Sequence, residues 1–372
     1  EPRARLITIL IAPLMTCSAR LPVYAMLIGA FVPQQTYLGG LLQLQGLVLG
    51  AMYLLGIGTA VAVAWLLKRF WFTGSTPSFV MELPGYKWPS LRTVLYRVLE
   101  RAWVFVRFAG TIILAVSILV WAGLYYPHRP EEVEGPFVSR AQQLGRQLQT
   151  WLAQTSNSPP EPEDVDVEAA TAKSALSELA QQLRSGQLPL ESLLEQADRQ
   201  LSQLPESSVP EYLLAQIEEL QAELLGAYQR QSLFGQMGRV LEPIFRPLGW
   251  DWRIGMAVMA SFPAREVVVA TLGVIFQAGP IDPEDPEQMT QLQRRLRSAT
   301  WEGSDEKLFN LPVALGMLVF YTLCAQCAAT LICIRRETGS WGWTAFVFGY
   351  MTTLAYLGAL LTYQLSAQIG WF

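Results

Sequence analysis

The sequence predicts an all-α, polytopic membrane protein, a bundle of about six membrane-spanning helices with a helical extramembranous insertion. Hydrophobic residues make up 51% of the 372 residues and charged residues only 16%, which is more apolar than an ordinary soluble domain. Twelve Trp and thirteen Tyr suit the aromatic belts found at membrane interfaces. Six apolar stretches are long enough to cross a bilayer, namely residues 6–32, 44–67, 103–126, 252–277, 309–334 and 342–365.

Basic residues orient these predicted spans. The loop 68–101 holds six Lys or Arg against two Glu, so the positive-inside rule places it in the cytoplasm. Strict alternation then puts the loop 127–249 outside and the loop 278–308 inside. It also puts the short basic loop 335–337 outside, which disagrees with the positive-inside rule. We expect the loops 68–101 and 278–308, which agree with each other, to determine the orientation of the spans. The predicted domains are a first region with three spans (1–126), an acidic extracytoplasmic helical loop (127–249) and a second region with three spans (250–372).

The long loop differs in composition from the rest of the chain. It holds 18 of the 31 acidic residues but only 9 of the 27 basic ones. Residues 156–166 are rich in Pro, Ser and acidic residues and predict a linker. Between 167 and 231, Leu and Ala recur at helical spacing, with breaks at 186–189 and 204–205. We expect a small helical domain without chemistry of its own.

The first predicted span is interrupted between residues 11 and 24. Pro13 and Pro22 each remove a backbone donor, so a helix here is kinked or broken. Broken backbone at membrane depth is tolerated only where it is buried in protein or lines a wet cavity. Arg20 lies in the same segment, where a guanidinium group costs about 3 kcal/mol near the bilayer centre. The segment therefore predicts either a functional break or a kinked packing helix whose Arg20 reaches the interface.

Sulfur and hydroxyl groups accompany this break. Met15 and Cys17 lie beside Thr16 and Ser18 within one turn. Such soft and mixed ligands suit a transition metal better than Na⁺ or Mg²⁺. Met15 and Cys17 are therefore candidate metal ligands.

Two other segments place charges where a bilayer resists them. The loop 79–89 is dense in Pro and aromatic residues, and Glu82 is its only acid. In the segment 261–273, Arg265 and Glu266 follow a proline inside an apolar run. Charges within the membrane are functional candidates by default. Glu266 can serve as a cation ligand or as a counter-ion to Arg265.

A cysteine pair marks the fifth apolar stretch. Cys324 and Cys327 are three residues apart, which on a continuous helix places both on one face. Their thiols are candidate ligands for Fe²⁺ or another borderline metal, especially together with Cys17. The alternatives are that they pack as small buried hydrophobes, or that they form the redox pair of a membrane thiol oxidoreductase.

These segments, in this order, resemble the membrane region of the bacterial ferrous iron transporter B (FeoB) family. Residues 13–24 look like its first gate motif, and 323–330 fall where the second gate lies, so the resemblance implies that two of the spans are broken at these gate motifs. Five shorter motifs are similar in type and order: Met-Glu-Leu-Pro at 81–84, Ala-Gly-Thr-Ile-Ile-Leu at 109–114, Pro-Leu-Gly-Trp-Asp-Trp at 247–252, Ala-Arg-Glu-Val-Val-Val at 264–269 and Glu-Thr-Gly-Ser-Trp at 337–341. The resemblance covers residues 1–126 and 232–365, and not the loop between them.

The resemblance implies uptake of Fe²⁺ as the transported ion across the bacterial cytoplasmic (inner) membrane, by a multi-pass transporter and not an enzyme. It implies metal ligands at Cys17 and at Cys324 or Cys327, with Glu82 and Glu266 in flanking motifs. We expect Arg20, Pro22 and Arg265 to hold the broken segments. The alternative is that the transported substrate is another divalent metal or a small solute.

The resemblance also implies partners. In that family a GTP-binding domain and the earliest spans precede the first gate, and no Gly-x-x-x-x-Gly-Lys-[Ser/Thr] phosphate loop occurs in this sequence. We expect no GTP site in these residues and a GTP-binding part in the same or a separate chain. Membrane lipid, small accessory Feo proteins and further copies of the chain are the other expected partners, and nucleic acid is not. The chain opens without Met or signal peptide, so we expect a piece of a longer protein.

Overall fold

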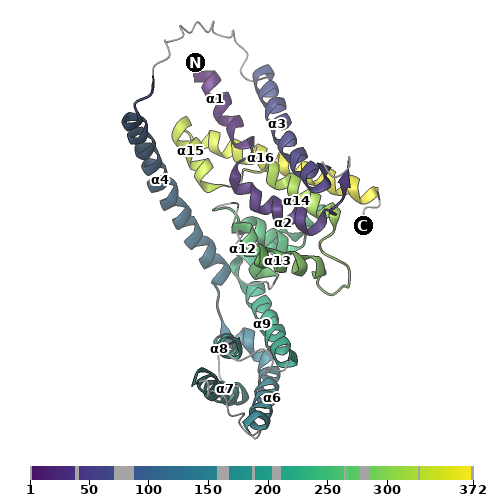
Figure 1. Cartoon of the computed structure of the whole chain (residues 1–372). Coiled ribbons are helices and arrows are strands. Elements are labelled where there is room, and N and C mark those ends of the chain that lie inside the picture. Colours follow the sequence, from purple (N-terminus) through teal and green to yellow (C-terminus); the bar gives the residue numbers. More distant parts are fainter. Residues whose placement is uncertain are drawn as a thin grey trace. The chain divides into compact units, whose positions relative to one another are not determined.

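A computed structural model describes residues 2–37, 42–70, 88–156, 167–186, 189–202, 211–263, 265, 267–276, 285–325 and 327–369. Nearly all of the described chain is helical (Figure 1), which confirms the predicted all-α class. The α-helices are α1 (Pro2–Ile11), α2 (Leu21–Phe31), α3 (Leu44–Phe70), α4 (Leu91–Tyr125), α5 (Pro130–Glu134), α6 (Val138–Ser156), α7 (Val167–Ser185), α8 (Leu190–Ser202), α9 (Glu211–Gln231), α10 (Leu233–Phe245), α11 (Trp252–Ala260), α12 (Val267–Ile275), α13 (Pro286–Ser298), α14 (Leu311–Leu323), α15 (Ala328–Thr338) and α16 (Trp341–Gln368).

Short elements complete the fold. In the described part of the chain, 3-10 helices cover Ala12–Leu14, Ser18–Arg20, Gly135–Phe137 and Arg246–Leu248. The strands β1 (Thr36–Tyr37) and β2 (Leu42–Gln43) form an antiparallel pair between α2 and α3.

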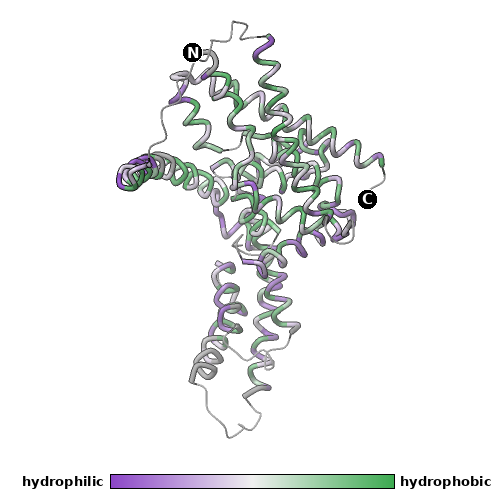
Figure 2. The backbone as a smooth tube through the Cα atoms, turned by 45° about the horizontal axis from the view of Figure 1, so that its top comes forward, coloured by the Kyte–Doolittle hydropathy of each residue, from purple (hydrophilic) through white to green (hydrophobic). Residues whose placement is uncertain are grey.

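The chain divides into two compact units. The membrane unit comprises Glu1–Ala122 and Met237–Phe372, and the insert unit comprises Gly123–Gln236. In the described part of the chain, four helical runs are long and apolar enough to cross a membrane: Arg5–Phe31, Leu44–Phe70, Leu311–Thr338 and Trp341–Gln368. A fifth is counted if Gly110–Tyr125 and Pro130–Gln154, which meet at 46°, form one bent span. Figure 2 shows hydrophobic residues along most of these helices.

One predicted span does not form as a single helix. The apolar stretch 252–277 is divided between α11 and α12, which have nine residues each and pack against each other. Nine helical residues extend about 14 Å, which is half of a bilayer core of about 30 Å. The expectation of one span here is therefore wrong, because α12 packs back against α11 and does not extend it.

Packing between α14 and α16 is the most extensive in the membrane unit. Small residues on both helices permit this close packing: Ala359 of α16 is fully buried, and its carbonyl oxygen would lie 3.5 Å from a Cβ atom added at Gly316 of α14. A Cβ atom added at Gly358 would lie 3.0 Å from the Leu323 side chain. Small residues at an interface let two helices in a membrane approach closely.

One end of the membrane unit is basic. Arg5 near the start of α1 forms an ion pair with Glu337 at the end of α15, and Leu67 near the end of α3 shares a buried cluster with residues of α1 and α16. Arg335 and Arg336 precede Glu337, and Lys68 and Arg69 follow Leu67. We call this the basic end; it includes the N-terminus and the turn from α15 to α16 (Figure 1).

The opposite end holds α13. Arg297 of α13 donates to the carbonyl oxygens of Gly29 and Ala30, where α2 ends. The sequence-based topology placed the loop 278–308 on the same side as the loop that begins at Lys68, and the structure contradicts this. The reason is the turn between α11 and α12, which removes one crossing, and it brings the short loop 335–337 to the side that its charges favour.

The insert unit is a helical domain, as the sequence predicts. Leu and Ala side chains of α6 to α9 form its core, which includes Leu148, Leu176, Leu183, Leu194 and Ile217 at 0% exposure. Helix α7 ends at Ser185 and α8 begins at Leu190, so the predicted break at 186–189 is confirmed. The predicted division of the chain into three domains stays a prediction.

Candidate functional site

The first candidate segment is a true helix break. Helix α1 ends at Ile11, and the backbone of Cys17 is extended (φ −110°, ψ 160°) before α2 begins at Leu21. Pro13 and Pro22 each lie in the first turn of a new helix, where the missing N–H has no partner to lose. Pro22 therefore fits the first turn of α2 without interrupting it. We call residues 12–20 the first break.

The second candidate segment is also broken. Helix α14 ends at Leu323 and α15 begins at Ala328. The backbone is extended both at Cys324 (φ −72°, ψ 153°) and at Cys327 (φ −141°, ψ 111°). The prediction that these cysteines share one helix face is therefore wrong, because the helix does not continue between them. We call residues 324–327 the second break.

A third break lies between α11 and α12, where residues 261–263 and 265 are described, and it lies against the second. The N–H of Ala328 donates to the carbonyl oxygen of Phe262 at 3.1 Å. Arg265 of the third break is buried at 5% exposure and donates to the carbonyl oxygens of Tyr321, at 3.4 Å, and Cys324. One guanidinium group thus binds carbonyl oxygens that the end of α14 leaves without helical partners.

Arg20 binds the backbone of the first break in a similar way. Its side chain is 1% exposed, and one Nη donates to the carbonyl oxygen of Pro13 at 3.2 Å. Nε and the other Nη of Arg20, like Nε of Arg265, are buried without a hydrogen-bond partner among the described residues. Within the same residues, no carboxylate lies within 4.0 Å of either guanidinium group. Among the described residues, the partners of the two guanidinium groups are therefore backbone carbonyl oxygens.

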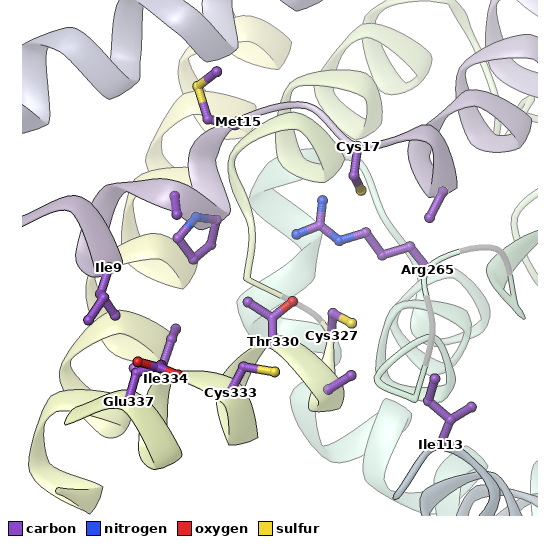
Figure 3. Close-up of a pocket in the computed structure, with 14 residues that line it drawn as sticks. Ile9, Met15, Cys17, Ile113, Arg265, Cys327, Thr330, Cys333, Ile334 and Glu337 are labelled. Carbon is purple, nitrogen blue, oxygen red and sulfur yellow. The ribbon is translucent and has the colours of Figure 1, made fainter. Parts of the chain in front are cut away.

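The three breaks surround one cavity of ≈ 460 Å³ (Figure 3), which we call the gate cavity. Cys17 reaches it from the first break, Cys327 from the second and Arg265 from the third, and Figure 3 shows the Arg265 guanidinium group between the two cysteines. The sequence-predicted thiols of two distant segments are thus brought together. The full lining is Ile9, Ala12, Pro13, Met15, Cys17, Ala19, Ile113, Arg265, Cys327, Ala329, Thr330, Cys333, Ile334 and Glu337.

The other predicted ligands have different places. Met15 lines the cavity and is 54% exposed. Cys324 is fully buried outside the lining, and its thiol donates to the carbonyl oxygen of Tyr321 at 3.8 Å. Glu82 and Glu266 lie outside the described residues. Among the residues that are described, no three His, Cys, Asp or Glu side chains are grouped closely enough to hold a metal ion together.

Several residues of the site had no signal in the sequence. The hydroxyl groups of Tyr24 on α2 and Thr322 on α14 are 2.8 Å apart and join the two broken spans. A Cβ atom added at Gly56 of α3 would lie 3.4 Å from the carbonyl oxygen of Leu14, so α3 passes close to the first break. Cys333 lines the cavity although no motif marks it.

Two protein-family models match the chain. Residues 49–101 match the model described as ferrous iron transport protein B C terminus. Residues 106–341, more than half of the chain, match the Gate model, described as nucleoside recognition. The chain belongs to the FeoB family. What it carries is the C-terminal membrane region with both gate segments.

Curated FeoB relatives align over nearly the whole chain. A Porphyromonas gingivalis protein named Fe(2+) transport protein A/Fe(2+) transporter FeoB fusion protein is 31% identical over 98% of this chain and 34% of its own length. Proteins named Fe(2+) transporter FeoB from Leptospira interrogans and Helicobacter pylori are each 28% identical, over 97% and 96% of this chain and 39% and 44% of their own lengths. The chain thus spans between about one third and less than one half of each relative's length. No solved structure matches it.

Proposed function

We propose that this chain is the membrane permease region through which ferrous iron is taken up across the bacterial cytoplasmic membrane. The observation that carries the proposal is the gate cavity, where Cys17 and Cys327 reach one space from two broken helices. Discontinuous helices that meet near the bilayer midplane are the usual place of ion sites in transporters. The relatives named Fe(2+) transporter support the choice of ion.

The chemistry of the cavity suits this cargo. Thiolates bind borderline transition metals better than they bind Mg²⁺ or Ca²⁺, and Met15 adds a thioether. A cation held by few protein ligands keeps part of its water shell and can leave again. Between Cys324 and Cys327 we choose Cys327 as the ligand, since Cys324 is buried away from the cavity. Glu82 and Glu266 remain proposed ligands by family resemblance.

Arg20 and Arg265 have a structural task in this proposal. Each binds carbonyl oxygens at a break, which keeps the backbone of that break in one conformation. The ordered breaks in turn fix where Cys17 and Cys327 reach the gate cavity.

The proposal includes partners outside these residues. A GTP-binding part, in the same or a separate chain, would control the gates, because the sequence itself contains no phosphate-binding loop. The fusion of Fe(2+) transport protein A with FeoB in one relative supports a small accessory Feo protein. Assembly of several copies in the membrane is a further part of the proposal.

The test is anaerobic Fe²⁺ binding to the purified chain in detergent. Cys17→Ser and Cys327→Ser should each weaken binding about tenfold or more, since each removes a metal–sulfur contact. Cys324→Ser is the matched control: it removes a thiol of the same break that does not line the cavity. Binding that is equal in all four proteins would contradict the proposal.

Competition separates iron from the alternative cargoes. If the cavity prefers Fe²⁺, an equal concentration of Mn²⁺ should displace little iron, as the general affinity order expects. The Gate model's description as nucleoside recognition makes adenosine the relevant small solute. Adenosine binding that is lost with Arg265→Gln and indifferent to Fe²⁺ would favour a solute permease instead.

A further inference from the structure

The gate cavity continues beyond the two breaks along α15. Its lining includes Thr330, Cys333 and Glu337 of that helix. Residues three or four apart share one face of an α-helix, and these three follow that spacing from Cys327, the N-cap residue of α15. We call Cys327, Thr330, Cys333 and Glu337 the α15 stripe. Figure 3 shows these side chains along one helix.

The far end of the stripe reaches the basic end of the membrane unit. There the Glu337 carboxylate pairs with the guanidinium group of Arg5. The two side chains are 51% and 66% exposed, and an ion pair at that exposure is weak and easily exchanged. Glu337 is therefore a carboxylate whose present partner is a replaceable cation.

Cys333 is the middle member of the stripe. Its thiol is free and exposed toward the cavity, whereas Cys324 is buried. A thiol, a hydroxyl group and a carboxylate in one line offer the mixed ligands that a borderline divalent cation accepts. No three His, Cys, Asp or Glu side chains cluster in the described residues, so a cation along this line has few thiol or carboxylate ligands at any point.

We propose that the α15 stripe is the second part of the cation path, and that the Arg5–Glu337 ion pair closes this path until a cation displaces Arg5. The cation held at Cys17 and Cys327 passes along Thr330 to Cys333 and Glu337, displaces the Arg5 guanidinium group from the carboxylate, and leaves at the basic end. Only metal–ligand contacts and one ion pair change. A thiol that binds the cation as a thiolate gives its proton to water and regains one when the cation leaves.

This inference rests on the proposed function and adds an exit to it. The basic end is the cytoplasmic end by the positive-inside rule, so the direction from the breaks to Glu337 is the direction of uptake. Few ligands at each point favour onward movement, since a path must bind weakly enough to release. The competing charge of Arg5 keeps Glu337 from trapping the ion.

The test measures how Fe²⁺ protects each cysteine of the purified chain from N-ethylmaleimide, with the alkylated peptides quantified by mass spectrometry. Anaerobic Fe²⁺ should slow the alkylation of Cys17, Cys327 and Cys333 several-fold, and Mg²⁺ should not. Glu337→Gln should weaken the protection of Cys333 and leave that of Cys17 unchanged. Arg5→Gln removes the competing cation and should protect Cys333 at several-fold lower Fe²⁺.

Matched variants make the result specific. Glu306→Gln neutralises an exposed carboxylate outside the cavity and should change nothing. Cys333→Ser should leave Cys17 and Cys327 protected, which shows that the cavity itself is intact. If Fe²⁺ protects those two thiols while Cys333 reacts at its metal-free rate, the exit along α15 is overturned and the proposed function stands. If no cysteine is protected, the proposed function fails as well.

Discussion

At the scale of single residues, Glu134 shows how the insert unit is held together. Its carboxylate is fully buried and accepts hydrogen bonds from the N–H groups of Leu190 (2.6 Å) and Glu191 (3.3 Å) and from the hydroxyl group of Tyr228 (2.6 Å). Burial raises the pKa of Tyr228, so the phenol stays protonated and donates. A carboxylate from α5 thus caps the N-terminus of α8 and joins it to α9.

Replacing this carboxylate should loosen the whole insert unit. Glu134→Ala leaves buried donors unpaired, at about 1–3 kcal/mol each. We expect faster hydrogen exchange in α8 and α9 of the full chain, with the exchange of α14 unchanged. Glu132→Ala is the control, because that side chain is exposed and pairs with Arg129 at the surface. Equal exchange in both variants would show that Glu134 contributes no more than a surface residue.

Glu191 gives the insert unit a pH dependence. Burial raises its pKa above the ordinary value of 4.5; nearby His128 opposes that shift, and Glu134 and Glu195 add to it. Between the ordinary and the raised pKa the folded unit binds more protons than the unfolded chain, so stability falls as pH rises through this window. Glu191→Gln should remove that fall. Hydrogen exchange of α8, corrected for its intrinsic pH dependence, measures it, and an unchanged slope would contradict the assignment.

At the scale of elements, we expect opposite effects on thermal stability when two glycines of α16 are replaced by alanine. Gly349 has open space around a would-be Cβ atom, whereas at Gly358 that atom would lie 3.0 Å from Leu323 and 3.1 Å from Val319. Alanine in a helix interior is favoured over glycine by about 1 kcal/mol. Gly349→Ala should therefore raise the thermal unfolding midpoint in detergent, and Gly358→Ala should lower it or leave it unchanged. A higher midpoint in both would mean that α14 and α16 are less closely packed than described.

Local residue signals predicted two of the three helix breaks. Pro13 and Pro22 mark the first break, and Pro263 marks the third. The second break has neither Pro nor Gly between Gly316 and Gly339, so only the family resemblance predicted it, whereas the spacing of Cys324 and Cys327 alone indicated a continuous helix. The stretch 252–277 was long enough for a span, but residue counts do not reveal that two short helices turn back on each other.

Contacts between segments far apart in the chain could not be predicted from the sequence, because no local pattern marks them. Tyr24 and Thr322 are 298 residues apart in the chain and share a hydrogen bond. Neither residue has a distinctive spacing or charge. The thiols of Cys17 and Cys327 could be proposed as partners from chemistry alone, but Cys333 joined them only once α15 was placed against the cavity.

At the scale of the whole membrane unit, the topology makes a prediction of its own. The end with Lys68, Arg335 and Arg336 should face the cytoplasm, and the loop after α13 should face the other side. Ser304→Cys should then react with a membrane-impermeant maleimide in intact cells, and Lys68→Cys should react only after lysis. The unchanged chain gives the background of the native cysteines. The reverse pattern would overturn the orientation, and with it the direction of exit along the α15 stripe.

The most direct test of the central claim is X-ray absorption at the iron edge of the Fe²⁺-loaded chain. If the gate cavity is the ion site, sulfur should be among the first-shell ligands of iron, and Cys17→Ser or Cys327→Ser should each lower the sulfur contribution while Cys324→Ser leaves it unchanged. Iron surrounded only by oxygen and nitrogen in the unchanged chain would contradict a thiol-lined path and would move the site to carboxylates and backbone carbonyl oxygens.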